Sequence, residues 1–194
     1  DLMRDADAAM YRAKARGRDC HEAFEAGGFE TGVLALRTSG ELRRGIERGE
    51  VVPYYQPIVD LASGRVLGYE VLSRWLHPDR GLLPPNDYLP LAEETGVLIE
   101  LGTRMLRDSL SQLAQWRAVG HPFANCFLSV NVGTRQLVDP NFAEIVVDAL
   151  AETGIDANSL WLEITETALF SDVKSATVAL RELRSLGLHL SVDD

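Results

Sequence analysis

The stretch from Gly68 to Trp75 contains the residue types that are needed to bind a charged ligand. If this stretch is a β-strand, its side chains alternate between two faces, so Glu70, Leu72 and Arg74 share one face. A carboxylate can hold a hard cation, an aliphatic side chain can pack on a flat ring, and an arginine can bind a phosphate through two hydrogen bonds. The pattern also fits a solvated strand with an ion pair on one face, and this stretch alone leaves both interpretations open.

Oxygen donors also occur near the ends of three later apolar segments, which we predict to be strands. These donors are Asn131 in segment 126–132, Glu163 in segment 160–166, and Asp193 and Asp194 in segment 188–194. A single polar residue at a strand end is usually a turn residue, whereas donors on four successive strands are hard to ascribe to chance. Together with Glu70 they predict a site for a hard divalent cation such as Mg²⁺ or Mn²⁺.

The elements that must position these donors alternate between strand and helix. We predict helices at 41–49, 99–119, 141–153 and 172–186, and a first strand at 51–59 that joins the Glu70 strand through a hairpin at 60–64. After Trp75 we predict a loop that includes His77 and is followed by a helix capped by Asn86. The alternation favours an α/β fold with a parallel sheet, whose apolar strands suit burial on both faces. A (β/α) barrel would gather the strand ends around one mouth.

The composition is that of an acidic chain of 194 residues, with 19 Lys and Arg against 29 Asp and Glu and a net charge of -10. This charge disfavours a nucleic-acid polymer or a membrane surface as partner. Cys20 and Cys126 form no CxxC pair and predict free thiols in a reducing, cytoplasmic compartment. No apolar run reaches membrane-spanning length, so a membrane tether would have to lie outside this sequence.

In these motifs the chain resembles the EAL domain, the family of cyclic di-GMP phosphodiesterases. The matching segments are Tyr54 to Val59, Gly68 to Trp75 with its Glu70-Val71-Leu72 signature, His77-Pro78, Pro90 to Glu93, Ser129 to Asn131 with Arg135-Gln136, Leu162 to Glu166, and Val192 to Asp194. The resemblance implies a (β/α)8 TIM-like barrel with an antiparallel first strand, of which about the first five strands are present. It also implies metal-dependent hydrolysis of cyclic di-GMP to linear pGpG in bacterial second-messenger signalling.

The resemblance also implies a role for individual residues. Glu70, Asn131, Glu163, Asp193 and Asp194 match the ligands of a two-metal site, and Glu70, Asp193 and Asp194 match catalytic positions. Gln56, Leu72 and Arg74 match substrate-binding positions, with Arg74 on a phosphate. Glu166 matches the acid that stabilises the loop after the Asp-Asp pair. The family often works as a dimer, so the implied partners are cyclic di-GMP and a second copy of the chain.

The sequence departs from the family pattern in two ways. Val71 stands where the family has Ala, and Gly133 stands where it often has Ser; we expect little effect from either. The family continues past the Asp-Asp pair with strands that carry a lysine, a glutamate and a glutamine, which are not in this sequence. We therefore hypothesise that this chain on its own is a weak or inactive catalyst.

The beginning of the chain resembles a second family. Residues 1–26 are similar to the closing helix and tail of a GGDEF (diguanylate cyclase) domain, in Ala6 to Lys14 followed by Gly17-Arg18, although the cyclase signature is not in this chain. Residues 27–40 are a predicted linker, and residues 41–194 are a predicted EAL domain that lacks its C-terminal third.

Three classes of function fit these patterns. The first is a phosphodiesterase, for which the donor set is intact. The second is a non-catalytic cyclic di-GMP receptor. The third is an unrelated metal-dependent barrel enzyme, such as one that abstracts a proton beside a carboxylate. Arg74 and Leu72, in phase with Glu70, fit a phosphate and a base ring better than this third substrate.

Overall fold

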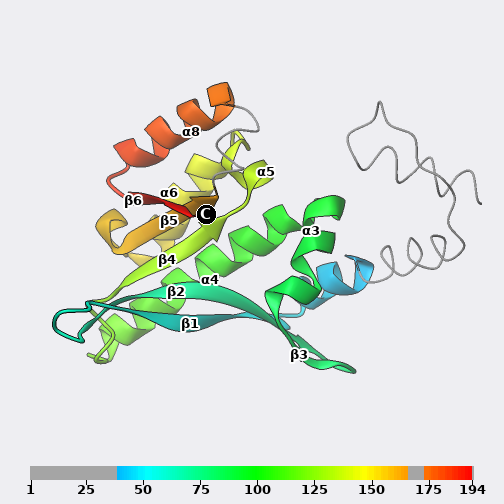
Figure 1. Cartoon of the computed structure of the whole chain (residues 1–194), viewed down its shortest axis with the longest axis horizontal. Coiled ribbons are helices and arrows are strands. Elements are labelled where there is room, and N and C mark those ends of the chain that lie inside the picture. Colours follow the sequence, from blue (N-terminus) through cyan, green and yellow to red (C-terminus); the bar gives the residue numbers. More distant parts are fainter. Residues whose placement is uncertain (1–38, 166–172, 194) are drawn as a thin grey trace, which may run out of the picture.

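The computed structural model describes residues 39–165 and 173–193, which form a sheet with helices packed against it (Figure 1). The strands are β1 (Val51–Val59), β2 (Val66–His77), β3 (Gly81–Leu83), β4 (Phe127–Val132), β5 (Leu160–Thr165) and β6 (His189–Asp193). The α-helices are residues 39–47, α3 (Leu89–Thr95), α4 (Leu98–Ala118), α5 (Thr134–Leu137), α6 (Phe142–Thr153) and α8 (Val173–Ser185). Two 3-10 turns, η1 (Pro85–Asp87) and η2 (Ala157–Ser159), complete the described elements.

The sheet has the strand order β1-β2-β4-β5-β6, and β3 pairs with β2 beside this path. β1 and β2 are antiparallel, whereas β2, β4, β5 and β6 run parallel to one another. Each parallel step crosses through at least one helix, as parallel strands require. The predicted α/β fold with an antiparallel first strand is therefore confirmed, and the sheet is the wall of a partial barrel.

The described helices cover one face of this sheet. Along β5, Leu160, Leu162 and Ile164 are buried in the core with residues of α4, α6 and α8. The alternate residues Trp161 and Glu163 are only half-buried and point to the opposite face. We call this opposite side, which also carries Glu70, Leu72 and Arg74 of β2, the open face. The expected burial on both faces does not hold for the described residues, because the polar side chains occupy the open face.

The helices form where apolar residues recur at helical spacing. In α4 the buried residues Leu101, Met105, Leu110 and Leu113 lie on one side, which packs on the sheet. The helix α6 ends at Gly154, whose positive φ of 66° is accessible to glycine at little cost. Within the described ranges, no helix combines the length and the apolar character that a membrane span needs.

The segment after Trp75 differs from the predicted loop. β2 continues to His77, the chain turns over residues 78–80, and it returns as β3 from Gly81, so a short hairpin replaces the predicted loop. Asn86 is not a helix cap, because it lies within η1, and α3 begins only at Leu89. A proline in the first turn of α3 lacks an N–H and has a helical φ, which favours a helix start there without a side-chain cap.

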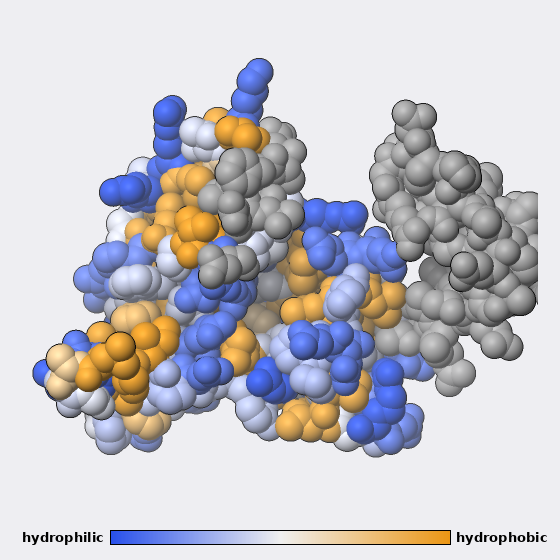
Figure 2. Space-filling view, in the orientation of Figure 1, coloured by the Kyte–Doolittle hydropathy of each residue, from blue (hydrophilic) through white to orange (hydrophobic). Residues whose placement is uncertain are grey.

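The turn between β1 and β2 is organised by one carboxylate. Asp60 Oδ1 accepts hydrogen bonds from the backbone N–H of Ser63 at 2.7 Å and of Ala62 at 3.0 Å. Exposed apolar side chains lie at this end of the hairpin: Leu61 is 96% and Leu67 is 45% accessible (Figure 2, left). The tip lies at the far end of β2 from Arg74 and so contributes nothing to the donor set on the open face.

Asp60→Ala is expected to lower the melting temperature, Tm, more at about pH 7 than at about pH 3. The hydrogen bonds from Ser63 and Ala62 stabilise the charged carboxylate and hold the pKa of Asp60 below its ordinary value. A lowered pKa gives stability that is present above the unfolded-state pKa and is lost as the pH falls through the folded-state pKa. Thermal unfolding of both proteins at the two pH values tests this, and an equal Tm difference at both would contradict it.

Candidate functional site

The open face of β2 carries the predicted row of functional side chains. Glu70, Leu72 and Arg74 alternate with buried or helix-facing residues along the strand, and all three are half-buried. β1 adds Gln56, which pairs in register with Glu70 and is exposed. The structure therefore brings the predicted substrate-binding residues and the first predicted metal ligand onto adjacent strands, as the two-residue period of each strand requires.

Asn131 joins this row from β4. Its side-chain Nδ2 donates a hydrogen bond to Glu70 Oε1 at 3.1 Å, across 61 positions of sequence. Asn131 also pairs in register with Glu163 of the next strand, β5. Because the amide nitrogen is turned toward Glu70, the predicted ligands from β2 and β4 are in direct contact.

Glu163 on β5 is a partly buried carboxyl group with a raised pKa. Ser129 Oγ donates a hydrogen bond to Glu163 Oε1 at 2.6 Å. The pKa of Glu163 is nevertheless raised, first because burial disfavours the charged carboxylate and then because Glu70 and Asp193 are negatively charged. Glu70 of β2 and Asp193 of β6 are therefore each close enough to Glu163 of β5 to disfavour its negative charge.

The types of ligand atom on the open face favour a metal ion, whereas the arrangement of the described side chains does not form a metal site. Carboxylate and amide oxygens are the ligands that Mg²⁺ and Mn²⁺ prefer, and mutual repulsion of the carboxylates favours a cation between them. However, no group of three or more His, Cys, Asp or Glu side chains within residues 39–165 and 173–193 is arranged to hold one. The predicted ligand Asp194 and the predicted loop-stabilising Glu166 lie outside the described residues. The types of ligand atom fit a hard cation, and they are the basis on which metal binding is proposed.

The comparisons with known proteins bear on this arrangement. Residues 39–194 match the family described as the EAL domain. This chain belongs to the EAL domain family. It is 39% identical over 193 residues to an uncharacterized signaling protein of Caulobacter vibrioides, covering 100% of this chain and 23% of that protein. It is 35% identical over 194 residues to the bifunctional diguanylate cyclase/cyclic di-GMP phosphodiesterase MucR of Pseudomonas aeruginosa, covering 100% of this chain and 28% of MucR. The chain thus spans about a quarter of these relatives.

Solved EAL structures have the same fold. The phosphodiesterase of MucR in complex with cyclic di-GMP matches with a TM-score of 0.75 and 34% identity, over 83% of this chain and 63% of that one. The EAL domain of DcpA from Mycobacterium smegmatis matches with a TM-score of 0.59 and 30% identity, over 74% of this chain and 55% of that one. These matches confirm the barrel-like fold that the sequence predicted.

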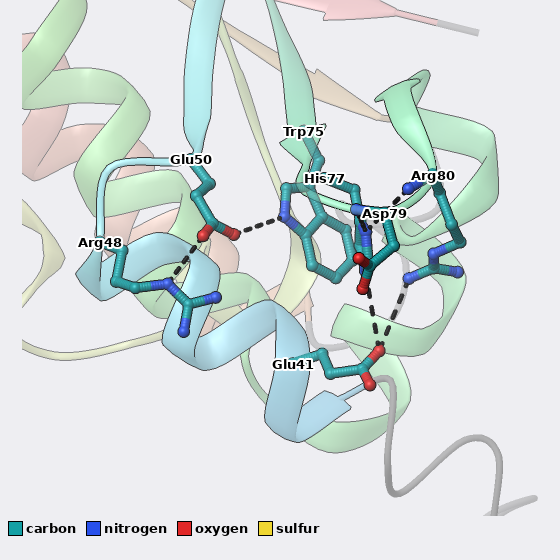
Figure 3. A network of polar contacts seen from close by, with 7 residues as sticks. All are labelled: Glu41, Arg48, Glu50, Trp75, His77, Asp79 and Arg80. Carbon is teal, nitrogen blue, oxygen red and sulfur yellow. Dashed lines mark hydrogen bonds and ion pairs between the residues drawn. The ribbon is translucent and has the colours of Figure 1, made fainter.

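In this EAL domain the end of β2 is fixed on the helix side by Trp75, which is 1% exposed (Figure 3). Its Nε1 donates to Glu50 Oε2 at 3.3 Å, and Glu50 Oε1 accepts from Arg48 Nε at 2.7 Å. The Arg80 guanidinium carbon lies 5.4 Å from the centre of the Trp75 ring. Since Trp75 directly follows Arg74, this packing fixes the backbone from which Arg74 projects.

His77 links the same strand end to the first helix of the EAL domain. Its Nδ1 accepts hydrogen bonds from the backbone N–H of Asp79 at 3.1 Å and of Arg80 at 3.2 Å. Its Nε2 lies 3.8 Å from Glu41 Oε2, in the helix at residues 39–47. His77 is therefore a buried structural residue at the turn, not a residue of an open loop, and Figure 3 shows it among these partners.

Two residues without a predicted role contact the predicted site. Ser129 is buried and hydrogen-bonds Glu163, and the Tyr54 ring faces the Arg74 guanidinium. Both are in phase with predicted site residues, Ser129 with Asn131 and Tyr54 with Gln56. The two-residue period of a strand was therefore enough to predict which face of the sheet these two side chains occupy. Their contacts depend in addition on how neighbouring strands align.

Proposed function

We propose that this EAL domain hydrolyses one phosphodiester bond of cyclic di-GMP to give linear pGpG, using Mg²⁺ or Mn²⁺. The observation that carries the proposal is the contact between Glu70 and Asn131, with Glu163 on the next strand and Arg74 on the same face. The named activity of MucR and the cyclic di-GMP in its similar structure support the same substrate. In this proposal the bound metal ions and Arg74 attract the anionic cyclic di-GMP, although the protein as a whole is acidic.

The proposed metal ligands are Glu70, Asn131, Glu163 and Asp193, with Asp194 as a further ligand. Divalent cations bound there would stabilise negative charge on the reacting phosphate and make a water molecule easier to deprotonate. Ser129 orients the Glu163 carboxylate through its hydrogen bond, and Asn131 does the same for Glu70. These contacts limit the rotation of both carboxylates, so the ligand oxygens are partly positioned before an ion binds.

The proposed substrate contacts lie on β1 and β2. Arg74 Nη1 donates to the Ser73 carbonyl oxygen at 2.8 Å, which uses one of the five N–H donors of the guanidinium. The remaining donors would bind a phosphate oxygen of cyclic di-GMP. Leu72 would pack on a guanine ring, and Gln56 would hydrogen-bond a base edge. Glu166 would stabilise the loop that follows the Asp193-Asp194 pair.

Nucleotide turnover tests this function directly. Cyclic di-GMP is incubated with Mn²⁺, with Ca²⁺ or with EDTA. Each incubation is made once with this chain and once with a longer protein that contains it, and the nucleotides are then separated by chromatography. We expect the longer protein to form pGpG with Mn²⁺ and not with EDTA, and this chain on its own to form little or none. Binding of cyclic di-GMP without turnover in both proteins would favour the receptor function instead. The proposal would be contradicted if both proteins failed to bind and to hydrolyse cyclic di-GMP.

Two variants separate the metal from the nucleotide in the same experiment. Glu70→Ala should abolish divalent-metal binding and turnover. Arg74→Ala should weaken cyclic di-GMP binding roughly tenfold to a hundredfold, as expected for charged hydrogen bonds, and leave metal affinity unchanged. The matched control is Arg107→Ala, because Arg107 lies on α4 and its guanidinium is 3.9 Å from the carboxylate of the exposed Glu152. Unchanged metal affinity in Glu70→Ala would show that the ion binds elsewhere.

The proposal includes the organisation of the chain. We assign residues 1–26 to the tail of a GGDEF-like domain, residues 27–40 to a linker and residues 41–194 to the EAL domain. The match of all 194 residues to MucR, whose name includes a diguanylate cyclase, supports this division. We also propose a cytoplasmic location and a homodimer, for which the family resemblance is the support. Analytical ultracentrifugation tests the dimer, and a monomer at all concentrations would contradict it.

A further inference from the structure

The ring of Tyr54 lies against the guanidinium of Arg74 across two strands. In the antiparallel pair, Tyr54 is opposite Leu72 and Val52 is opposite Arg74, so Tyr54 and Arg74 are diagonal neighbours on the open face. The guanidinium carbon is 5.6 Å from the centre of the ring. Diagonal neighbours with long or aromatic side chains can interact, and this distance falls within the range of a cation–π contact.

This contact complements the hydrogen bond at the other side of Arg74. Nη1 donates to the Ser73 carbonyl oxygen at 2.8 Å, and the Ser73 hydroxyl in turn accepts from the Tyr88 hydroxyl at 2.7 Å. Tyr88 is fully buried, so Ser73 is anchored in the core. The backbone therefore holds one nitrogen of the guanidinium, while Tyr54 limits the motion of its plane. A long side chain restricted in this way loses less conformational freedom when it binds a ligand.

We propose that Tyr54 is a positioning residue that holds Arg74 in the orientation that binds a phosphate of cyclic di-GMP. The inference rests on the proposed function for the identity of the ligand. Tyr54 itself is 44% exposed, so its ring is accessible from the solvent at the same place where the ligand would approach. The contact needs the π face of the ring and does not need the hydroxyl group.

The first test is a double-mutant cycle on nucleotide binding. Binding of cyclic di-GMP in the presence of Ca²⁺ is measured for the wild type, Tyr54→Leu, Arg74→Ala and the double variant, with Tyr54→Phe as the matched control. We expect Tyr54→Leu to weaken binding roughly two- to fivefold, which is the range of an exposed cation–π contact. Tyr54→Phe should bind like the wild type. In the Arg74→Ala background, Tyr54→Leu should have no further effect, because Tyr54 acts through Arg74.

Other results of this cycle would overturn the inference. Equal losses from Tyr54→Leu with and without Arg74 would mean that Tyr54 contacts the ligand independently. A loss of the same size in Tyr54→Phe would assign the effect to the hydroxyl group. Metal affinity and Tm, measured on the same proteins, should be the same in Tyr54→Leu and Tyr54→Phe, and a loss of either in Tyr54→Leu alone would indicate a structural role.

A second test needs no ligand and so separates this inference from the proposed function. The NMR signal of the Arg74 Nε–H group is recorded for the free wild type, Tyr54→Leu and Tyr54→Phe. We expect the signal to shift in Tyr54→Leu, because the ring current is lost, and to stay in place in Tyr54→Phe. An identical signal in all three proteins would overturn the positioning role. A wild-type chain that binds no cyclic di-GMP but passes this test would contradict the proposed function alone.

Discussion

Replacing Glu163 with glutamine is expected to abolish the rise in Tm that we expect Mg²⁺ to cause in the wild-type chain. The carboxyl group of Glu163 lies within the electrostatic reach of Glu70 and Asp193, and this repulsion helps to raise its pKa. A divalent cation bound among these groups would remove the repulsion in the folded state and would not do so in the unfolded chain. Glutamine keeps a side chain of similar shape but supplies no charge to hold the ion.

The expected size of this effect follows from binding linkage. An ion at about 100 times its dissociation constant stabilises the folded chain by about 2.7 kcal/mol. In a chain of this length, 1 kcal/mol changes Tm by about 2–4 °C. Thermal unfolding of protein freed of metal with EDTA and titrated with Mg²⁺ should therefore show a rise of roughly 5–10 °C in the wild type and almost none in Glu163→Gln.

The same variant has a second signature that a simple loss of folding could not produce. Without metal, Glu163→Gln should unfold at a higher temperature than the wild type, because the substitution removes a partly buried negative charge that Glu70 and Asp193 also disfavour. The control is Glu144→Gln on α6, which is exposed on the helical side of the sheet and should keep the full response to Mg²⁺. The same Mg²⁺-induced rise in Glu163→Gln and in the wild type would place the ion elsewhere.

For the described site residues, the strand sequences were sufficient to predict which side chains share a face. In β5, buried apolar residues alternate with Trp161 and Glu163, and in β2 they alternate with Glu70 and Arg74. A two-residue period fixes the face of every side chain once the strand is recognised. The antiparallel first pair was predictable as well, because a five-residue turn signal at Asp60 to Gly64 is too short for a parallel crossover.

The contacts within the site could not be predicted in the same way. The bonds from Asn131 to Glu70 and from Ser129 to Glu163 depend on the register of adjacent parallel strands, which the pattern within one strand does not specify. The three-residue strand β3 is too short to show a period. It forms because Gly81, with φ of 73°, allows the chain to reverse after His77.

Gly68→Ala is expected to destabilise the domain, although alanine normally suits a strand better than glycine. A Cβ atom on Gly68 would lie 2.5 Å from Cε2 and 2.6 Å from Cδ2 of the Phe127 ring, its register partner on β4. That ring stacks on Trp161 with centroids 4.6 Å apart, and Trp161 stacks on His189 at 4.8 Å. The Phe127 ring therefore has a neighbour on the side toward which it would have to move.

Overpacking of this kind costs about 1–3 kcal/mol, so the Tm of Gly68→Ala should fall by roughly 2–12 °C. Glu70 follows two positions later on β2, so a displaced strand should also weaken the Mg²⁺ response. The matched control is Phe127→Leu, which removes the ring: Gly68→Ala should cost little in that background, because the clash is with the ring alone. If Gly68→Ala were as stable as the wild type, the Phe127 ring would have to move aside for the added methyl group. The stacked rings of Phe127, Trp161 and His189 would then not be what fixes the position of β2 against β4.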